Sequence, residues 1–195
     1  GKPEQMGLRK ILEIFISFRE QVVTRRTKFR LAKARKRGHE TVGLAIAVAN
    51  NDEVNKLIRD SPDPSTARER MLARDWPSGD MMPLIALIAD PRTVVTEGDA
   101  IRLSDEQARS ILALQLSRLT GLGRDDIAKA ANEIADEIKE LLSILGSRDR
   151  IFEIIRGELA DVKAAFGIPR RTQFSESEGD IDDVALIPRD EMGVT

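Results

Sequence analysis

The sequence predicts an all-α fold: a long antiparallel two-helix coiled coil that carries a small helical globular head. Two observations predict it. A helical segment lies near each end of the chain, at roughly residues 8–49 and 127–166, and about 75 residues separate the two. Each segment has about 40 residues, so each would be about 60 Å long at a rise of 1.5 Å per residue. Two rods of equal length, joined through a longer stretch, indicate a helical hairpin with a globular head at its tip.

The later helical segment has apolar residues in alternating steps of four and three. A repeat of 3.5 residues is typical of a helix that pairs with another along its length. These seam residues are Ile127, Ala131, Ile134, Ile138, Leu141, Leu145, Phe152, Ile155, Leu159, Val162 and Phe166. At Gly146 and Ser147 we expect a bend or short break without loss of register. Glycine disfavours helix by about 1 kcal/mol relative to alanine, and Ser147 can cap a new start.

The earlier helical segment has its own apolar stripe, which we expect to face the partner helix. The stripe residues are Ile11, Phe15, Phe18, Val22, Phe29 and Ala32. Gly38 and Gly43 weaken the later part of this helix, so we expect its tip to pack into the head. The small apolar residues at 44–48 suit close helix packing there.

The stretch between the rods predicts a head of short helices. One is expected at 53–59, and Asp63 precedes a proline and can cap a second. Residues 74–103 are the least regular part, because prolines and glycines punctuate them. A short helix is expected near 83–89 and a brief extended piece at 93–96. Trp76, in a loop flanked by proline, is expected to plug the core beneath it.

Ser104 and Gln107 have the spacing of a capping box, in which the serine bonds the amide three residues on and the glutamine reaches back. They open a helix expected at 105–119. Its apolar residues mostly share one face, and Leu114 lies on the other. The return helix is expected to begin near Arg124.

These elements divide the chain into four parts. Residues 1–50 are the first coiled-coil arm, residues 51–123 the globular head and residues 124–170 the return arm. Residues 171–195 are acidic and lack periodicity, so we expect a mobile tail.

Composition narrows the function classes. Charged residues make up 33% of the chain and aromatic residues 4%, which fits long solvated helices better than one compact core. Because the chain has no cysteine, it has no disulfide and no thiolate site. No run of 18 apolar residues suggests a membrane span, and no signal peptide opens the chain, so a cytoplasmic location is expected.

The charge of the chain is unevenly distributed. Residues 1–50 hold 12 Lys and Arg but only 4 Asp and Glu, a balance of +8, while the remainder has a balance of −10. The basic residues concentrate between Arg25 and Arg37. Such a stripe attracts a polyanion by counterion release. The alternative is that it faces the acidic return helix of the same chain.

The residues that carry chemistry form no recognisable active site. The chain has no tyrosine and one histidine, His39, for which a structural role is expected. Asp180, Asp182 and Asp183 lack the spacing of a calcium loop, and the glycines at 121 and 123 fall short of a phosphate loop. We therefore expect no catalytic residue, no metal site and no cofactor.

Seven blocks of the chain follow one another as they do in the A subunit of bacterial DNA gyrase. They are residues 8–12, 22–29, 43–47, 103–108, 118–122, 144–147 and 166–172. The chain therefore resembles the type IIA topoisomerase A subunits over nearly its whole length. The blocks at 22–29 and 118–122 are more similar to gyrase than to its topoisomerase IV paralogue, which stays the alternative.

The resemblance implies a fragment: the coiled-coil arm and the head that meets a second head to form the exit gate for the transported DNA duplex. The cleaving tyrosine lies in an upstream domain, and a DNA-wrapping β-pinwheel lies downstream. Magnesium and ATP act elsewhere in the holoenzyme. The implied partners are a second copy of the chain, the rest of the gyrase A subunit, the gyrase B subunit, the duplex and gyrase-targeting toxins at the head.

We expect two interfaces. The candidates for the dimer interface on the helix at 105–119 are Gln107, Ser110, Leu114, Gln115 and Arg118. The candidates for weak contact with DNA are Arg25, Arg26, Lys28, Arg30 and Lys33. Two further hypotheses stay open: a nucleic-acid-binding helical arm, which tight duplex binding would favour, and a plain coiled-coil scaffold, which a monomer in solution would favour.

Overall fold

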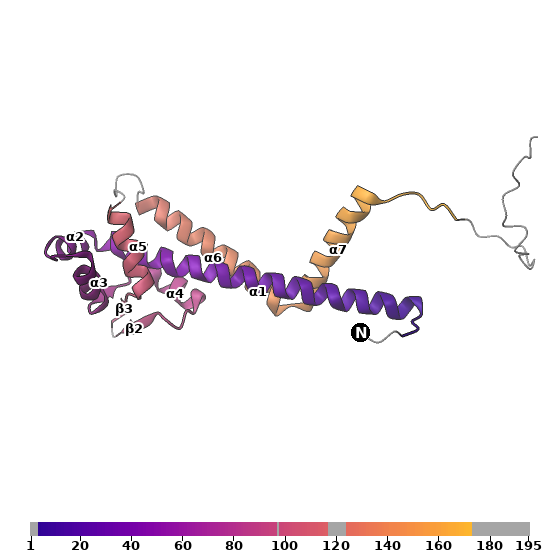
Figure 1. The fold of residues 1–195 in the computed structure, drawn as a ribbon, viewed down its shortest axis with the longest axis horizontal. Helices are drawn as coiled ribbons and strands as arrows, with labels where there is room; N and C mark the ends of the chain where they lie inside the picture. The colour runs from indigo at the N-terminus through magenta and orange to yellow at the C-terminus, as the bar shows by residue number, and fades with distance from the viewer. Residues whose placement is uncertain (1–3, 97, 117–123, 173–195) are drawn as a thin grey trace, which may run out of the picture. The chain divides into compact units, whose positions relative to one another are not determined.

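A computed structural model describes residues 4–96, 98–116 and 124–172 of the 195-residue chain (Figure 1). The chain forms two units, residues 1–159 and residues 160–195. The second unit holds the last turns of α7 and the exposed residues that follow it as far as 172. The contacts that build the fold and the candidate interfaces lie within the first unit.

The described part contains seven α-helices, one short 3₁₀ helix and three short strands. In order they are α1 (Leu8–Ala49), α2 (Asn51–Arg59), α3 (Pro64–Leu72), β1 (Asp75–Pro77), η1 (Gly79–Met81), α4 (Met82–Ile88), β2 (Val94–Thr96), β3 (Ala100–Arg102), α5 (Asp105–Leu116), α6 (Arg124–Gly146) and α7 (Arg148–Phe166). The predicted mainly helical fold class is confirmed. None of the described helices is long and apolar enough to cross a membrane.

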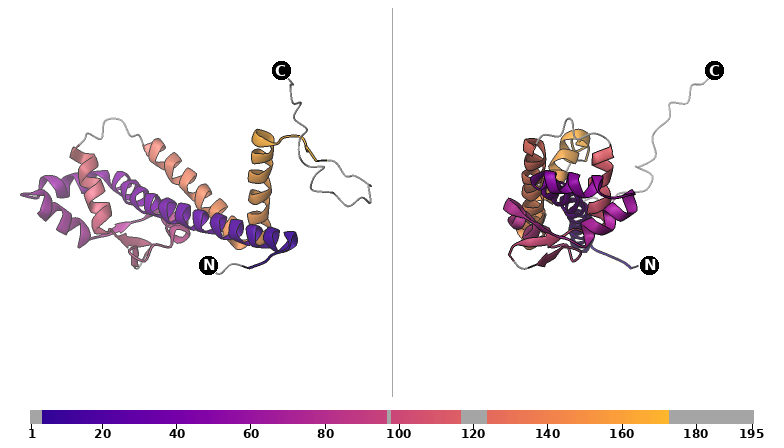
Figure 2. Two further views of the ribbon diagram at one scale, coloured as in Figure 1. Left: turned by 45° about the vertical axis from the view of Figure 1, so that its right-hand side comes forward. Right: turned by 90° about the vertical axis from the view of Figure 1, so that its left-hand side faces the viewer.

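Helices α1 and α6 pack side by side, and the left-hand view of Figure 2 shows that they run in opposite directions. With 42 residues, α1 is about 63 Å long at 1.5 Å per residue. Five of the predicted seam residues on α6 are buried: Ile127, Ala131, Ile134, Ile138 and Leu141. The antiparallel helical pair is thus confirmed along α6.

The buried stripe of α1 differs from the predicted one. Its buried residues are Val23, Thr27, Leu31, Ala34, Gly38, His39, Val42, Gly43, Ile46 and Ala47. Phe29, which was expected in the stripe, is 71% exposed, and Ile11, Phe15 and Phe18 are also exposed. The buried stripe is rotated relative to the predicted one, and it includes the small residues Thr27 and Ala34. Thr27 loses no hydrogen bond on burial, since its hydroxyl donates to the Val23 carbonyl at 2.8 Å.

The predicted break in the return helix is confirmed, because α6 ends at Gly146 and α7 begins at Arg148. The expectation that the seam keeps its register was wrong. Arg148 binds Glu20 of α1, yet Glu158, ten residues further along α7, binds Arg19 and Arg26. A helix that ran alongside α1 would have moved about 15 Å along it over ten residues. The first half of α7 therefore crosses α1 near one short stretch.

A small separate core forms at this crossing. Val23 of α1 packs against Ile151 and Ile155 of α7, whereas Leu159, which the seam predicted to be buried, is 42% exposed. Ser147 lies outside both helices, and this non-helical residue redirects the chain so that the apolar pattern of α7 meets α1 only over its first turns.

The head surrounds the tip of α1. Helices α4 and α5 pack against α1, and α4 also packs against α6. Helix α3 packs against α5, and α2 packs against α3. A Cβ on Gly38 would lie 2.8 Å from the Ile88 side chain of α4, so the absence of a side chain lets the two helices approach. The predicted packing of the α1 tip into the head is confirmed.

The irregular stretch of the head folds into a three-stranded antiparallel sheet in the order β1-β3-β2. The extended piece expected at 93–96 corresponds to β2, and β1 and β3 are additions to the predicted helical head. Trp76 lies opposite Ile101 in the register of the sheet, and both are fully buried. Trp76 donates to the Met71 carbonyl at 3.0 Å, so it plugs the core as expected.

Candidate dimer and DNA interfaces

Helix α5 is the candidate dimer helix, and its start is fixed by the predicted capping box. The Gln107 amide donates to Ser104 Oγ at 3.2 Å, and the Ser104 amide donates to Gln107 Oε1 at 3.0 Å. Ala108 and Ile111 form its buried face. The helix packs against α1 and α3, so its remaining faces are positioned by the rod and the head together.

The structure separates the dimer-interface candidates. Gln107 is 1% exposed, and its side chain is engaged within the chain, so we leave it out of the proposed interface. Ser110 and Leu114 are half-buried on α5 and stay candidates. The Gln115 side chain and the whole of Arg118 lie outside the described residues. Leu114 is therefore the apolar candidate that the structure places at the surface of α5.

The DNA-facing candidates also fall into two groups. Arg26 forms an ion pair with Glu158 of α7. Lys28, Arg30 and Lys33 are exposed, and none has an ion pair within the described part of the chain. Arg25 is exposed as well, and its Nε donates to the Gln21 carbonyl of its own helix at 3.4 Å.

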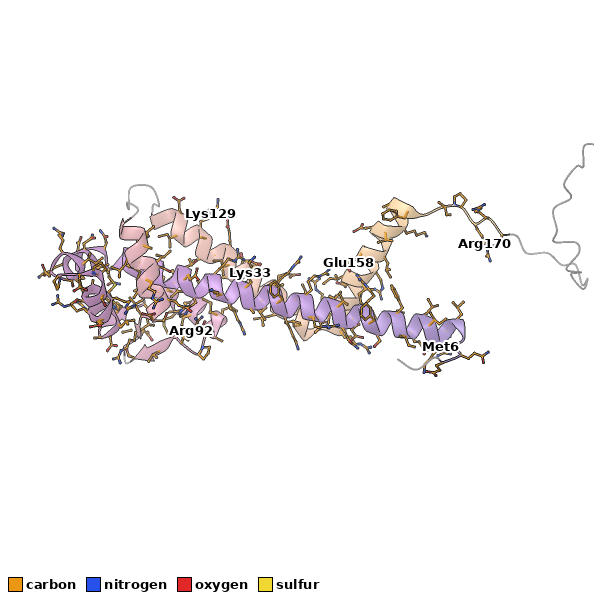
Figure 3. All side chains as sticks on the ribbon, in the orientation of Figure 1. Met6, Lys33, Arg92, Lys129, Glu158 and Arg170 are labelled. Carbon is orange, nitrogen blue, oxygen red and sulfur yellow. The ribbon has the colours of Figure 1, made fainter. Side chains whose placement is uncertain are left out.

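A basic face runs along α1 opposite its buried stripe. At about 100° per residue, Arg25, Lys33 and Lys36 lie on the side away from Leu31, and Lys28 lies at the edge of this face, about 60° from Leu31. All four are exposed. Figure 3 shows Lys33 on α1 between the head and the region of Glu158. No Asp or Glu occurs between residues 21 and 39, so no acidic residue of this stretch of α1 offsets the charge of the basic face.

The alternative, pairing with the acidic return helix, holds for other cations. Arg37 pairs with Glu137 of α6, and Arg19 joins Arg26 on Glu158. The hydrogen bond from Arg26 is the main cause that lowers the pKa of Glu158. These partly exposed ion pairs contribute little to stability. Because they involve other cations, the residues of the basic face stay available to bind another anion.

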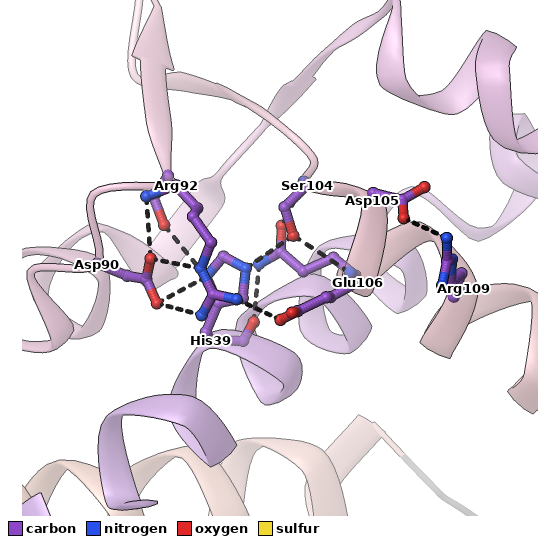
Figure 4. A network of polar contacts seen from close by, with 9 residues as sticks. His39, Asp90, Arg92, Ser104, Asp105, Glu106 and Arg109 are labelled. Atoms are coloured by element: carbon purple, nitrogen blue, oxygen red, sulfur yellow. Dashed lines mark hydrogen bonds and ion pairs between the residues drawn. The ribbon is translucent and has the colours of Figure 1, made fainter. Parts of the chain in front are cut away.

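A polar network that the sequence did not predict lies inside the head (Figure 4). His39 of α1 is buried between Asp90 and Ser104. Asp90 binds Arg92, whose guanidinium also binds Glu106 of α5. Burial is the main cause that lowers the pKa of His39, so the ring is neutral at pH 7. The Arg92 hydrogen bond is the main cause that lowers the pKa of Asp90 to about 2.

Comparison with known proteins identifies the family. The family model for the A subunit of DNA gyrase and topoisomerase IV matches residues 1–160. The chain belongs to this family. It is 51% identical over 195 residues to the DNA gyrase A subunit of Granulibacter bethesdensis. It is 40% identical to the gyrase A subunit of Rickettsia bellii over 197 residues and to that of Pseudomonas aeruginosa over 204.

Each of these comparisons covers the whole of the present chain but only 21%, 21% and 22% of the relatives. The chain therefore spans about a fifth of the length of the gyrase A subunits that it matches. Within the described residues, no group of three or more His, Asp or Glu side chains is placed to hold a metal ion. The aspartates at 180–183 lie outside the described residues.

The His39 network could be predicted only in part from the sequence of this gyrase-family chain. The capping box at Ser104 was visible, and so was a single histidine in a helix. Nothing in the spacing showed that the two would meet, because 65 residues separate them. The buried partners of His39 can be identified only from the folded structure, in which the head packs against α1.

Proposed function

We propose that this chain is the exit gate of a gyrase A subunit: two heads meet across a two-fold axis, and the transported duplex leaves between them. The observation that carries the proposal is the family match over residues 1–160 together with a head at the tip of the paired α1 and α6. A head held away from the rest of the protein on a long rod is suited to enclose a space and close it by dimerisation.

The parent enzyme that we infer is an ATP-dependent type IIA topoisomerase of the cytoplasm. All three relatives are gyrase A subunits, which favours gyrase over topoisomerase IV, whereas the family model includes both. Magnesium and ATP would act in other parts of the holoenzyme. Because the chain has no tyrosine, it supplies no tyrosine nucleophile for strand cleavage, and the isolated chain should form no covalent adduct with DNA.

The gate would close through α5. Ser110 and Leu114 are half-buried in one chain, and a second head would cover them. An apolar side chain at the centre of an interface often contributes 2 kcal/mol or more to binding. Besides a second copy, the partners we expect are the rest of the gyrase A subunit, the gyrase B subunit and, at the head, gyrase-targeting toxins.

The basic face of α1 would make weak contact with the passing duplex. Exposed lysines bind phosphates without reading sequence, and such binding weakens steeply with salt. Weak contact suits a gate, since a tightly held duplex would not leave. In the intact enzyme, neutralising Lys28 and Lys33 should slow strand passage more than DNA cleavage.

A second candidate function, a nucleic-acid-binding arm, is favoured by the same basic face. Two measurements on the 195-residue chain separate the candidates: molar mass by light scattering over a concentration range, and duplex affinity at physiological salt. The exit gate predicts a dimer with a Kd for DNA no better than about 10⁻⁴–10⁻⁶ M. A monomer that binds duplex at nanomolar concentration would favour the arm, and a monomer that binds none would favour a scaffold.

A further inference from the structure

The start of α5 is joined to α1 by hydrogen bonds to one residue, His39. His39 Nε2 lies 2.7 Å from Ser104 Oγ, and the His39 backbone carbonyl accepts a hydrogen bond of 2.7 Å from Gln107 Nε2. Ser104 and Gln107 are also the two residues of the α5 capping box. The side chains that start α5 therefore also fasten it to the arm.

The proton positions in this contact fit together. Ser104 Oγ accepts from the Gln107 amide, so its own proton is available for His39 Nε2. The proton of the neutral ring then lies on Nδ1, which faces Thr93 Oγ1 at 3.3 Å and Asp90 at 3.8 Å. Each ring nitrogen thus has a partner on a different segment of the head. A displaced ring would leave buried polar groups unpaired, which costs more than an ordinary hydrogen bond contributes.

The opposite side of the network ties the same helix to the turn before β2. Arg92 bridges Asp90 and Glu106, and Glu106 is in the first turn of α5. Asp90 itself faces His39. The start of α5 is therefore held by a closed ring of contacts. In this ring, His39 is the residue that belongs to the arm helix α1.

We propose that His39 is a positioning residue of the gate, which transmits the position of the arm helix α1 to α5. The inference rests on the proposed function, because α5 is a gate helix only if the head dimerises through it. A shift of α1 moves His39, the capping box follows, and Ser110 and Leu114 on the same helix change position. The dimer contact therefore responds to the arm, where the passing duplex would act.

Two substitutions at His39 test the inference in the 195-residue chain. In His39→Gln the side-chain amide reaches the position of Nε2 and keeps the Ser104 contact. In His39→Asn the amide reaches only the position of Nδ1 and loses that contact. We expect His39→Asn to raise the dimer dissociation constant about tenfold, the effect of losing one buried hydrogen bond, and His39→Gln to change it less than about threefold. Sedimentation measures the constant, and chemical denaturation measures the stability of each variant.

A second pair of variants covers the case in which His39→Asn does not fold. Ser104→Gly removes the hydroxyl at a small capping cost, because glycine is tolerated at an N-cap. Asp63→Gly removes the cap of α3, where Asp63 accepts from the Thr66 amide, and serves as the control for a destabilised head. We expect Ser104→Gly to weaken the dimer about tenfold and Asp63→Gly to leave it unchanged.

The inference is overturned if His39→Asn and Ser104→Gly dimerise like the unchanged chain, or if Asp63→Gly weakens the dimer as much as they do. In either case His39 would be an ordinary core residue. A monomeric unchanged chain is a different result, because it would overturn the proposed function and this inference with it.

Discussion

The side chain of Gln107 occupies the space beside Gly43 where any other residue would place its Cβ. A Cβ built on Gly43 would lie 2.7 Å from both Cβ and Cγ of Gln107. Gly43 lies one turn after His39 on α1, so α5 approaches α1 through a notch in that helix. The contact explains why a glycine is present in the middle of a long helix, where it costs about 1 kcal/mol relative to alanine.

Replacing Gly43 by alanine should therefore destabilise the chain, although alanine is the better helix former. Overpacking of a well-packed site costs about 1–3 kcal/mol, which outweighs the gain in helix propensity. Gly157→Ala in α7 is the matched control, since a Cβ there meets nothing within 4 Å, and it should stabilise by about 0.5–1 kcal/mol. Denaturant unfolding followed by the fluorescence of Trp76, the single tryptophan, measures both. Equal effects of the two substitutions would contradict the notch.

The buried His39 predicts a pH dependence of stability. Its pKa in the folded chain is lowered from the ordinary value of 6.5, so below that pH the unfolded chain binds more protons than the folded one. Stability should consequently fall as the pH drops from about 6.5 towards the folded pKa. Asp90 and Arg92, which face the ring, keep their charges in this window, because the pKa of Asp90 is lowered and that of Arg92 is raised. His39→Gln should flatten the dependence, and an unchanged slope would show that another group is responsible.

The lowered pKa of Asp90 predicts a second loss of stability at lower pH. Its folded pKa of about 2 is below its ordinary value of 3.8, so its contribution to stability is present above pH 3.8 and disappears as the pH falls towards 2. Asp90→Asn should remove this component. It should enlarge the histidine component, because the Asp90 charge raises the pKa of His39 against the effect of burial. Denaturation curves between pH 2 and pH 5 would test the loss of the Asp90 component, and the same acid slope in the variant would contradict it.

The exposed lysines of the basic face should dominate the salt dependence of DNA binding. Each phosphate contact that is lost lowers the slope of log K against log salt by about 1. We expect Lys28→Gln together with Lys33→Gln to lower the slope by about 2, and Arg26→Gln, whose side chain is held by Glu158, to lower it by less. Fluorescence anisotropy with a short duplex measures the slope. If Arg26→Gln has the larger effect, the ion pair with Glu158 opens when DNA binds.

Much of the fold could be predicted because its signals are local. Asp63 before a proline and Ser104 three residues before Gln107 specify helix starts through bonds within one turn. The seam on α6 also repeats locally. The sheet could not be predicted, because β1, β2 and β3 have three residues each, and the pairing of Trp76 with Ile101 depends on contacts 25 residues apart in sequence.

The errors on α1 and α7 have physical causes of the same kind. Phe29 is more apolar than Thr27, yet Phe29 is exposed and Thr27 is buried. Burial is tolerated at Thr27 because its hydroxyl is satisfied within the helix. The heptad pattern continues past Ser147, but this one non-helical residue changes the direction of the chain. As a result, the later positions of the pattern no longer face the helix that the pattern predicts. The sequence predicted an interface on α5 only because the helix has more apolar residues than one face can bury. That surplus does not show that Gln107 is buried in the core, whereas Leu114 lies at the surface.

The most direct test of the gate is the molar mass of the 195-residue chain with Leu114 replaced by aspartate. A charge at the centre of an apolar contact should shift the chain from dimer to monomer in light scattering, while the helix content seen by circular dichroism stays unchanged. Ala86→Asp, at an exposed position of α4, is the control and should remain dimeric. A Leu114→Asp chain that stays fully dimeric at low micromolar concentration would contradict the account.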